Sequence, residues 1–151
     1  MRNFFIGILV LFLISCTSDD DKKENPIDNP SFSVDLLLNR WKYNQVNING
    51  QQYLYGHQPN CQKDEFTFAN NQGQIRQYSE LTFVNDICSS NTTIMEWKIK
   101  NDIISLYFGI EKVIDFKVIT LTEDSFVYSY IYDIDNDNVA DNIIIFAVPY
   151  E

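Results

Sequence analysis

Residues 93–134 read TIMEWKIKNDIISLYFGIEKVIDFKVITLTEDSFVYSYIYDI, and they give the clearest indication of the fold. It holds a succession of short segments rich in Ile, Val, Phe and Tyr, which favour strands. The segments are residues 93–100, 103–109, 112–120 and 125–134. None of them has the long 3.6-residue apolar period of a helix. Short polar links favour antiparallel neighbours, so the stretch predicts a β-meander.

Similar segments lie on both sides of this stretch, at a spacing near ten residues. They are residues 41–48, 65–69, 74–84 and 142–150, which raises the predicted number of strands to eight. Residues 51–62 are expected to be a loop, as is the chain from Cys88 to Asn91. Phe32 and the leucines at 36–38 suggest a short helical turn. Eight strands that close on themselves leave no exposed edge.

We therefore expect an all-β fold, an eight-stranded antiparallel up-and-down barrel with a short N-terminal helical turn. The chain of 151 residues is expected to form one domain, residues 32–151. A barrel of eight strands encloses room for packed side chains or for one small ligand.

The N-terminus has the features of an export signal. Arg2 supplies a positive start, and Phe4–Ile14 is an apolar run of 11 residues. This run is too short to span a bilayer, which takes about 20 residues. The sequence Leu13-Ile14-Ser15-Cys16 resembles the lipobox of bacterial lipoproteins. We expect residues 1–15 to be a lipoprotein signal peptide and Cys16 to be lipidated; the alternative is a secretory peptide with a chance cysteine.

Residues 16–31 are polar and acidic and contain two prolines. They cannot bury enough apolar surface to fold, so a disordered tether is expected. The acidic run after Cys16 resembles export tags that send some lipoproteins to the outer cell face. This predicts an outer-membrane lipoprotein exposed at the cell surface, with the periplasmic face as the alternative.

The net charge of −10 argues against a nucleic-acid partner, because phosphates repel such a surface. The expected partners are the membrane, through the lipid anchor, and in one alternative another envelope protein.

Of the 3 cysteines, Cys61 and Cys88 remain once Cys16 is assigned to lipid. An even pair in an exported domain predicts a disulfide, here across 28 residues counting both ends. A redox pair is disfavoured because there is no CxxC motif. A zinc site is disfavoured because His57 is the chain's one histidine.

Several short motifs carry a family resemblance. Residues 38–42, LNRWK, look like the Leu-x-Gly-x-Trp opening of lipocalin-like domains, with Asn39 where the family often has glycine. Residues 61–68 and 96–99 resemble small lipocalin-like lipoproteins of the Bacteroidota type. The resemblance covers about residues 33–150. It implies an eight-stranded up-and-down barrel, a disulfide between the two non-lipid cysteines, and binding of a small apolar molecule.

Aromatic residues recur on the predicted strands, and those at 126, 128, 130 and 132 share one face because side chains alternate. One hypothesis is a ligand cavity lined by rings, with tyrosine hydroxyls at its polar end. The alternative is a packed barrel core. The candidate ligand-binding residues are Trp41, Tyr43, Phe68, Trp97, Tyr128 and Tyr130.

Carboxylates at Asp133, Asp135, Asp137 and Asp141 occupy positions 1, 3, 5 and 9 of a pattern that resembles the first part of a calcium loop. Position 6 is Asn138 rather than glycine, and position 12 is not a glutamate. The alternative is a polar hairpin loop in which Asp and Asn make the turn. Ca²⁺ is the one cofactor that the sequence suggests.

No catalytic constellation stands out. His57 lies in an expected loop without a nucleophile motif. Asp64 and Glu65 are adjacent, so on a strand they would point to opposite faces and form no carboxylate pair.

We expect a lipid-anchored, non-enzymatic binding module for a small hydrophobic ligand. The rival is a structural or interaction lipoprotein with a filled barrel in an envelope complex.

Overall fold

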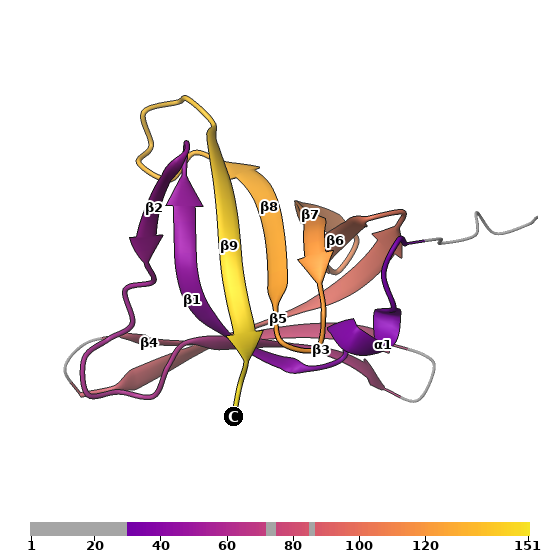
Figure 1. Ribbon diagram of the computed structural model, residues 1–151, viewed down its shortest axis with the longest axis horizontal. Helices are drawn as coiled ribbons and strands as arrows, with labels where there is room; N and C mark the ends of the chain where they lie inside the picture. The colour runs from indigo at the N-terminus through magenta and orange to yellow at the C-terminus, as the bar shows by residue number, and fades with distance from the viewer. Residues whose placement is uncertain (1–29, 72–74, 85–86) are drawn as a thin grey trace, which may run out of the picture.

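The computed structural model describes residues 30–71, 75–84 and 87–151. The predicted signal peptide, Cys16 and nearly all of the predicted tether lie outside these residues. The described chain forms strands and one short helix (Figure 1). The elements are α1 (Val34–Leu37), β1 (Arg40–Ile48), β2 (Gln51–Leu54), β3 (Glu65–Asn71), β4 (Ile75–Val84), β5 (Ser89–Lys100), β6 (Ile103–Phe108), β7 (Glu111–Leu121), β8 (Phe126–Tyr132) and β9 (Asp141–Pro149).

The strands form a closed antiparallel barrel. From β3 to β9 each strand pairs with the next in sequence order, and β1 pairs with both β3 and β9. The closing ladder runs from Trp41 opposite Pro149 to Ile48 opposite Ile143. The predicted all-β, eight-stranded up-and-down barrel is therefore confirmed, with β2 as one additional strand on the edge of β1.

Two loop predictions were wrong. Residues 51–54 form β2, because Asn49 and Gly50 adopt positive φ angles of 52° and 90° and turn the chain straight back along β1. An Asn-Gly pair between two strand-forming segments is the strongest short-range sequence signal for a β-hairpin. The second error is at β5, which begins at Ser89 rather than Thr93 because Val84 and Ser89 continue the ladder with β4.

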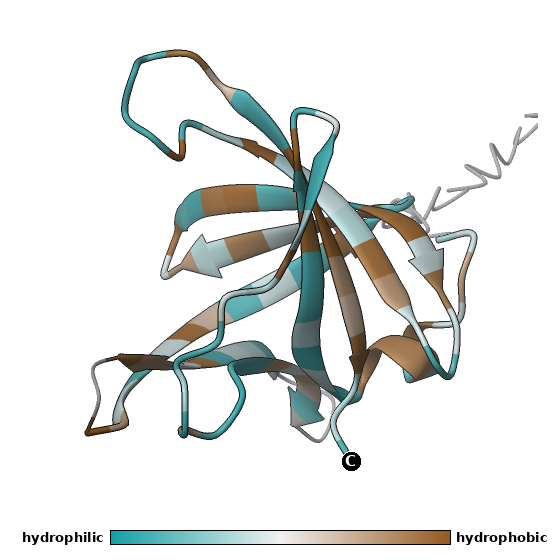
Figure 2. Ribbon diagram, turned by 60° about the vertical axis from the view of Figure 1, so that its left-hand side comes forward, coloured by the Kyte–Doolittle hydropathy of each residue, from teal (hydrophilic) through white to brown (hydrophobic). Residues whose placement is uncertain are grey.

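Alternating burial explains why these segments are strands. In β9 the side chains of Ile143, Ile145 and Ala147 face the interior, while their neighbours are less buried. Figure 2 shows the same alternation as hydrophobic and hydrophilic bands along the strands. A period of two matches the pleat of a strand with one buried face.

The barrel is filled at the end where α1 packs. The short helix confirms the predicted helical turn, and its Leu37 is fully buried. The indole N–H of Trp41 donates a hydrogen bond to the carbonyl of Leu37, with an N–O distance of 3.4 Å. Trp41 and Phe126 pack with ring centroids 5.5 Å apart. We call this region, with α1 and the rings around Trp41, the closed end.

No helix within the described ranges is long and apolar enough to cross a membrane.

The segment between β2 and β3 is fastened to the barrel wall. A disulfide joins Cys61 to Cys88, directly before β5, which confirms the predicted bridge. His57 Nε2 lies 2.8 Å from the carbonyl oxygen of Tyr43, and its Nδ1 lies 3.0 Å from the amide nitrogen of Asp64. Nδ1 accepts from that amide, so Nε2 carries the proton that is donated to Tyr43. The imidazole thus ties this segment to β1.

The wall is open along one seam. β7 and β8 pair only from Lys117 opposite Ser129 to Leu121 opposite Phe126. The first half of β7 pairs with β6 alone, and Tyr130–Tyr132 of β8 pair with β9 alone. We call the gap between these unpaired halves the β7–β8 seam; it lies at the end of the barrel opposite the β7–β8 turn (Figure 1).

Candidate ligand-binding site

A cavity of about 290 Å³ lies inside the barrel beyond the closed end. Its volume is close to the lower limit of about 300 Å³ for small-molecule sites. Aliphatic side chains, Phe116 and Glu80 contribute to its wall. Its tyrosines come from β1, the segment after β2, β4 and β8, and they are Tyr43, Tyr55, Tyr78, Tyr128, Tyr130 and Tyr132.

Glu80 is the polar centre of this cavity. It follows Tyr78 by two positions on β4, so the two side chains share the inner face of the strand. The hydroxyl of Tyr43 donates a hydrogen bond to its carboxylate. Tyr78 and Tyr128 line the same cavity, and both act electrostatically on Tyr43. These three tyrosines are at most 5% exposed, so the Tyr43–Glu80 hydrogen bond is surrounded by buried side chains.

Burial controls the protonation of Glu80 and of the tyrosines around it. Desolvation raises the pKa of the Glu80 carboxyl, the hydrogen bond from Tyr43 lowers it in part, and the charge of Asp64 raises it further. Desolvation also raises the pKa values of Tyr43, Tyr78 and Tyr128 well above the usual range. These hydroxyls therefore stay protonated at neutral pH and remain available as donors.

The cavity continues into a groove along the β7–β8 seam. The groove has a volume of about 830 Å³, and Val113, Ile114, Tyr130 and Tyr132 line both spaces. Ile119, Ile131 and Ile144 extend it over the outer surface of the barrel. The missing ladder between β7 and β8 thus gives the interior a sideways, largely apolar opening.

The six ligand-binding residues proposed from the sequence fall into two groups in the structure. Tyr43, Tyr128 and Tyr130 line the cavity. The other three belong to the packed closed end, where each is at most 1% exposed, and they are Trp41, Phe68 and Trp97. Alternation identified the inner face of each strand but not the height of a residue along the barrel axis. All six side chains point inward, and only Tyr43, Tyr128 and Tyr130 lie far enough from the closed end to line the cavity.

Sequence reasoning missed Tyr55, Tyr78 and Glu80. A signal for the last two was present, because in Tyr78-Ser79-Glu80 the carboxylate falls on the same face as a tyrosine. An acidic residue on the inner face of a strand is unusual and marks a candidate polar anchor.

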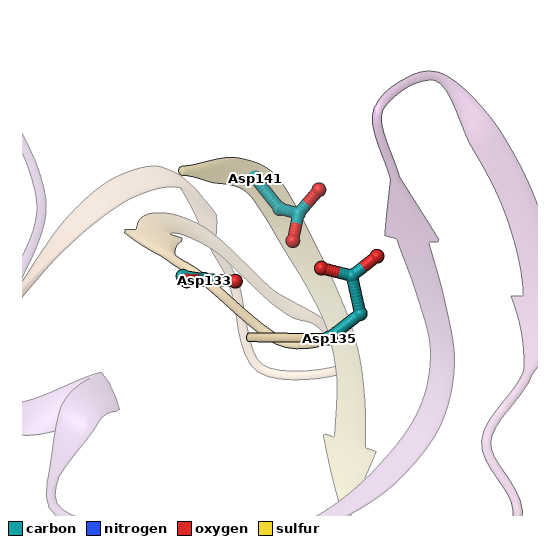
Figure 3. A group of neighbouring side chains, drawn as sticks. All are labelled: Asp133, Asp135 and Asp141. Carbon is teal, nitrogen blue, oxygen red and sulfur yellow. The ribbon is translucent and has the colours of Figure 1, made fainter. Parts of the chain in front are cut away.

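The β8–β9 loop gathers three carboxylates. Ligand oxygens of Asp133, Asp135 and Asp141 lie within 4.8 Å of one another, whereas Asp137 is outside this group (Figure 3). The Asp133 carboxylate accepts hydrogen bonds from the amides of Asp137 and Asn138, at 3.2 and 2.9 Å. These bonds build the polar turn that was the alternative interpretation, and calcium binding here stays a prediction.

The other polar residues singled out earlier have separate partners. Asp64 accepts a hydrogen bond of 2.8 Å from the amide of Phe83. Glu65 forms an ion pair of 2.5 Å with Arg40. His57 is engaged with backbone groups at both ring nitrogens. None of these contacts places a base beside a nucleophile.

A family model described as a lipocalin-like domain matches residues 37–128, more than half of the chain. The matched range includes Tyr43, Tyr78 and Glu80, and it ends within β8 at Tyr128. No curated protein matches the chain.

Proposed function

The chain belongs to the lipocalin-like domain family, and on this premise we propose that it binds a small hydrophobic ligand in the cavity around Glu80. The observation that carries the proposal is an interior that is packed at the closed end and hollow at the other. The ligand would lie against Phe116 and the cavity tyrosines, with its polar group near Glu80.

The wall has the composition that such a ligand requires. Met95, Leu106 and Ile145 supply apolar surface, and the buried hydroxyls supply a few fixed polar contacts. Apolar walls with a small number of convergent polar groups are the usual form of ligand sites. The groove at the β7–β8 seam would hold any part of the ligand that is too long for a cavity of about 290 Å³.

The rival function, a structural or interaction protein, requires a barrel filled along its whole length. The closed end meets that requirement, but the cavity and its lateral opening do not. We therefore favour the binding module, acting without catalysis.

We further propose that this module is lipid-anchored and works outside the cytoplasm. The support is the sequence of residues 1–31, with its apolar run, its lipobox-like residues before Cys16 and its acidic, proline-containing continuation. The proposed location is the outer membrane, facing the cell exterior. Fatty acid on a single cysteine would hold the module there while the barrel remains in water.

A fluorescence titration tests ligand binding. A chain beginning at Thr17 contains every residue of α1 and the barrel, so it retains all the contacts described here. The probe is N-phenyl-1-naphthylamine, which is neutral and lipophilic. We expect saturable binding at one site per chain, with competition by small apolar molecules. Absence of saturable binding for this probe and for a varied panel of apolar ligands would overturn the proposal.

A further inference from the structure

The cavity combines one carboxylate with several aromatic rings. Tyr43 and Tyr55 stack with ring centroids 4.5 Å apart, and Phe116 and Tyr130 lie 5.6 Å apart across β7 and β8. Glu80 lies in the same wall, and the described residues that line the cavity include no lysine, arginine or histidine. A carboxylate supplies the charge opposite to that of a cation, and ring faces attract cations through their quadrupoles. Together they are the recognition chemistry of organic ammonium groups.

Glu80 has no basic partner among the ion pairs of the described chain. Among the residues that the structure describes, its hydrogen-bond partner in the cavity is the neutral hydroxyl of Tyr43. A partly buried carboxylate without a counter-charge is unfavourable, because burial penalises the charged form. A ligand that brings its own positive charge would remove this penalty.

Resting on the function proposed above, we propose that the ligand is a cationic amphiphile, a molecule with an ammonium group and an apolar chain. The ammonium group would lie beside Glu80 among the cavity tyrosines. The apolar chain would run past Val113 and Ile114 into the groove at the β7–β8 seam, since these residues line both spaces.

The charges nearest the cavity oppose an anionic ligand, whereas Lys112, Asp115 and Lys117 line only the groove. Asp64 is 5% exposed, and its charge acts on Glu80 with the same sign. The whole chain carries a net charge of −10, which adds long-range repulsion of anions. A neutral ligand meets no repulsion, but it leaves the Glu80 charge without compensation. The three classes of head group should therefore bind in the order cation, neutral molecule, anion.

Three amphiphiles with the same eight-carbon chain test this order. Octyltrimethylammonium, octyl glucoside and octyl sulfate are titrated by calorimetry, below micelle formation, into the chain beginning at Thr17. We expect the cation to bind at least tenfold more tightly than the sulfate, with the glucoside between them. Glu80→Gln should remove most of the advantage of the cation over the glucoside. Glu123→Gln makes the same change in net charge at an exposed turn at the other end of the barrel, and it should leave the advantage intact.

The possible results separate this proposal from the one on which it rests. Equal affinity for all three amphiphiles, or an unchanged cation advantage in Glu80→Gln, would overturn the cationic ligand and leave a hydrophobic binding module. A loss of the advantage in both glutamate variants would also overturn it, because overall charge would then be the cause. Failure of all three amphiphiles to bind while N-phenyl-1-naphthylamine binds would overturn the cationic ligand alone. Failure of the amphiphiles, the probe and the apolar panel together would overturn the binding function itself. The comparison in the unmodified chain requires no variant, so it decides the order even if Glu80→Gln does not fold.

Discussion

The hydroxyl of Tyr43 on β1 donates its hydrogen to the carboxylate of Glu80 on β4, across the interior of the barrel. The two residues are 37 positions apart, and β3 lies between their strands in the sheet. The bond is therefore a cross-barrel contact rather than a pairing of neighbouring strands. It fixes a carboxylate in a wall that is otherwise aromatic and aliphatic, apart from Met95.

The stability of the protein should depend on pH through Glu80. Its folded-state pKa is raised by burial, so the folded protein keeps a proton at pH values where the unfolded chain has lost it. This contribution is fully present below the ordinary value of 4.5 and is lost as pH rises through the folded-state pKa. The Glu80→Gln variant has no charge at this position. Its free energy of unfolding, relative to that of the unmodified chain, should therefore increase as pH rises through this window and become constant above it.

Urea unfolding from about pH 4 to about pH 8 measures this difference. The other titratable groups that face Glu80 are Asp64 and the tyrosines at 43, 55, 78, 128 and 130, and they are present in both chains. Glu123→Gln is the matched control at an exposed turn. Parallel pH profiles for Glu80→Gln and the unmodified chain would show that the Glu80 carboxyl has the same pKa folded and unfolded.

A large side chain at the seam should block binding without unfolding the barrel. Val113 lines both the cavity and the groove and is 55% exposed, so an indole at this position has solvent-side room. We expect Val113→Trp to weaken N-phenyl-1-naphthylamine binding at least tenfold, with stability changed by only about 0.5 kcal/mol. Leu54→Trp, on β2 and 78% exposed, is the control and should bind normally. Equal affinities in the two variants would place the probe elsewhere.

His57 should contribute to stability through its two backbone hydrogen bonds. His57→Ala leaves the carbonyl of Tyr43 and the amide of Asp64 without these partners, in a partly buried region. The expected loss is about 1–3 kcal/mol in the free energy of unfolding, from chemical denaturation. His57→Gln keeps a donor and an acceptor and should lose less. A loss within experimental error for His57→Ala would contradict the structural role assigned to the imidazole.

Removal of the disulfide should cost stability but not binding. Cys61 and Cys88 close a loop with a sequence separation of 27, and neither residue lines the cavity. The chain-entropy model gives a loss of about 3–4 kcal/mol for the double variant Cys61→Ser, Cys88→Ser. Denaturation and probe titration on the same sample measure both properties. Loss of probe binding under conditions where the variant is folded would show that the bridge shapes the site.

The lipid anchor is tested in cells. The apolar run before Cys16 predicts that globomycin, which blocks the lipoprotein signal peptidase, causes the precursor to accumulate. Cys16→Ser should prevent acylation and release the chain from the membrane fraction. Protease treatment of intact cells then separates the proposed surface exposure from a periplasmic location. Normal processing and membrane partitioning of Cys16→Ser would contradict the anchor.

Most of the fold followed from local patterns, because alternation and short polar links determine both strand positions and antiparallel order. The exceptions were β2 and the beginning of β5. In both places polar residues such as Gln51 and Ser89 form strands through ladder hydrogen bonds on an exposed hairpin. Polar composition had suggested loops there, because strand propensity on a solvent-exposed edge gives a weak signal.

The site was less predictable for a geometrical reason. Trp41 and Tyr43 are two residues apart on the same face of β1, yet one packs at the closed end and the other reaches the cavity. The position along the barrel axis where side chains no longer fill the interior depends on strand tilt. It also depends on which side chains the opposite strands supply. The gap between β7 and β8 is likewise a matter of pairing between strands, which composition does not encode.

The proposed function depends most on where an apolar ligand lies in the barrel. Octyl glucoside is neutral, so its titration into an isotope-labelled chain beginning at Thr17 can be followed by NMR without a charge effect. Chemical-shift changes and intermolecular contacts are predicted at Val113, Ile114 and Tyr130, with the closed-end groups of Leu37 and Trp97 unaffected. Contacts scattered over exposed apolar residues such as Leu54, with none at the cavity wall, would contradict a ligand site inside the barrel.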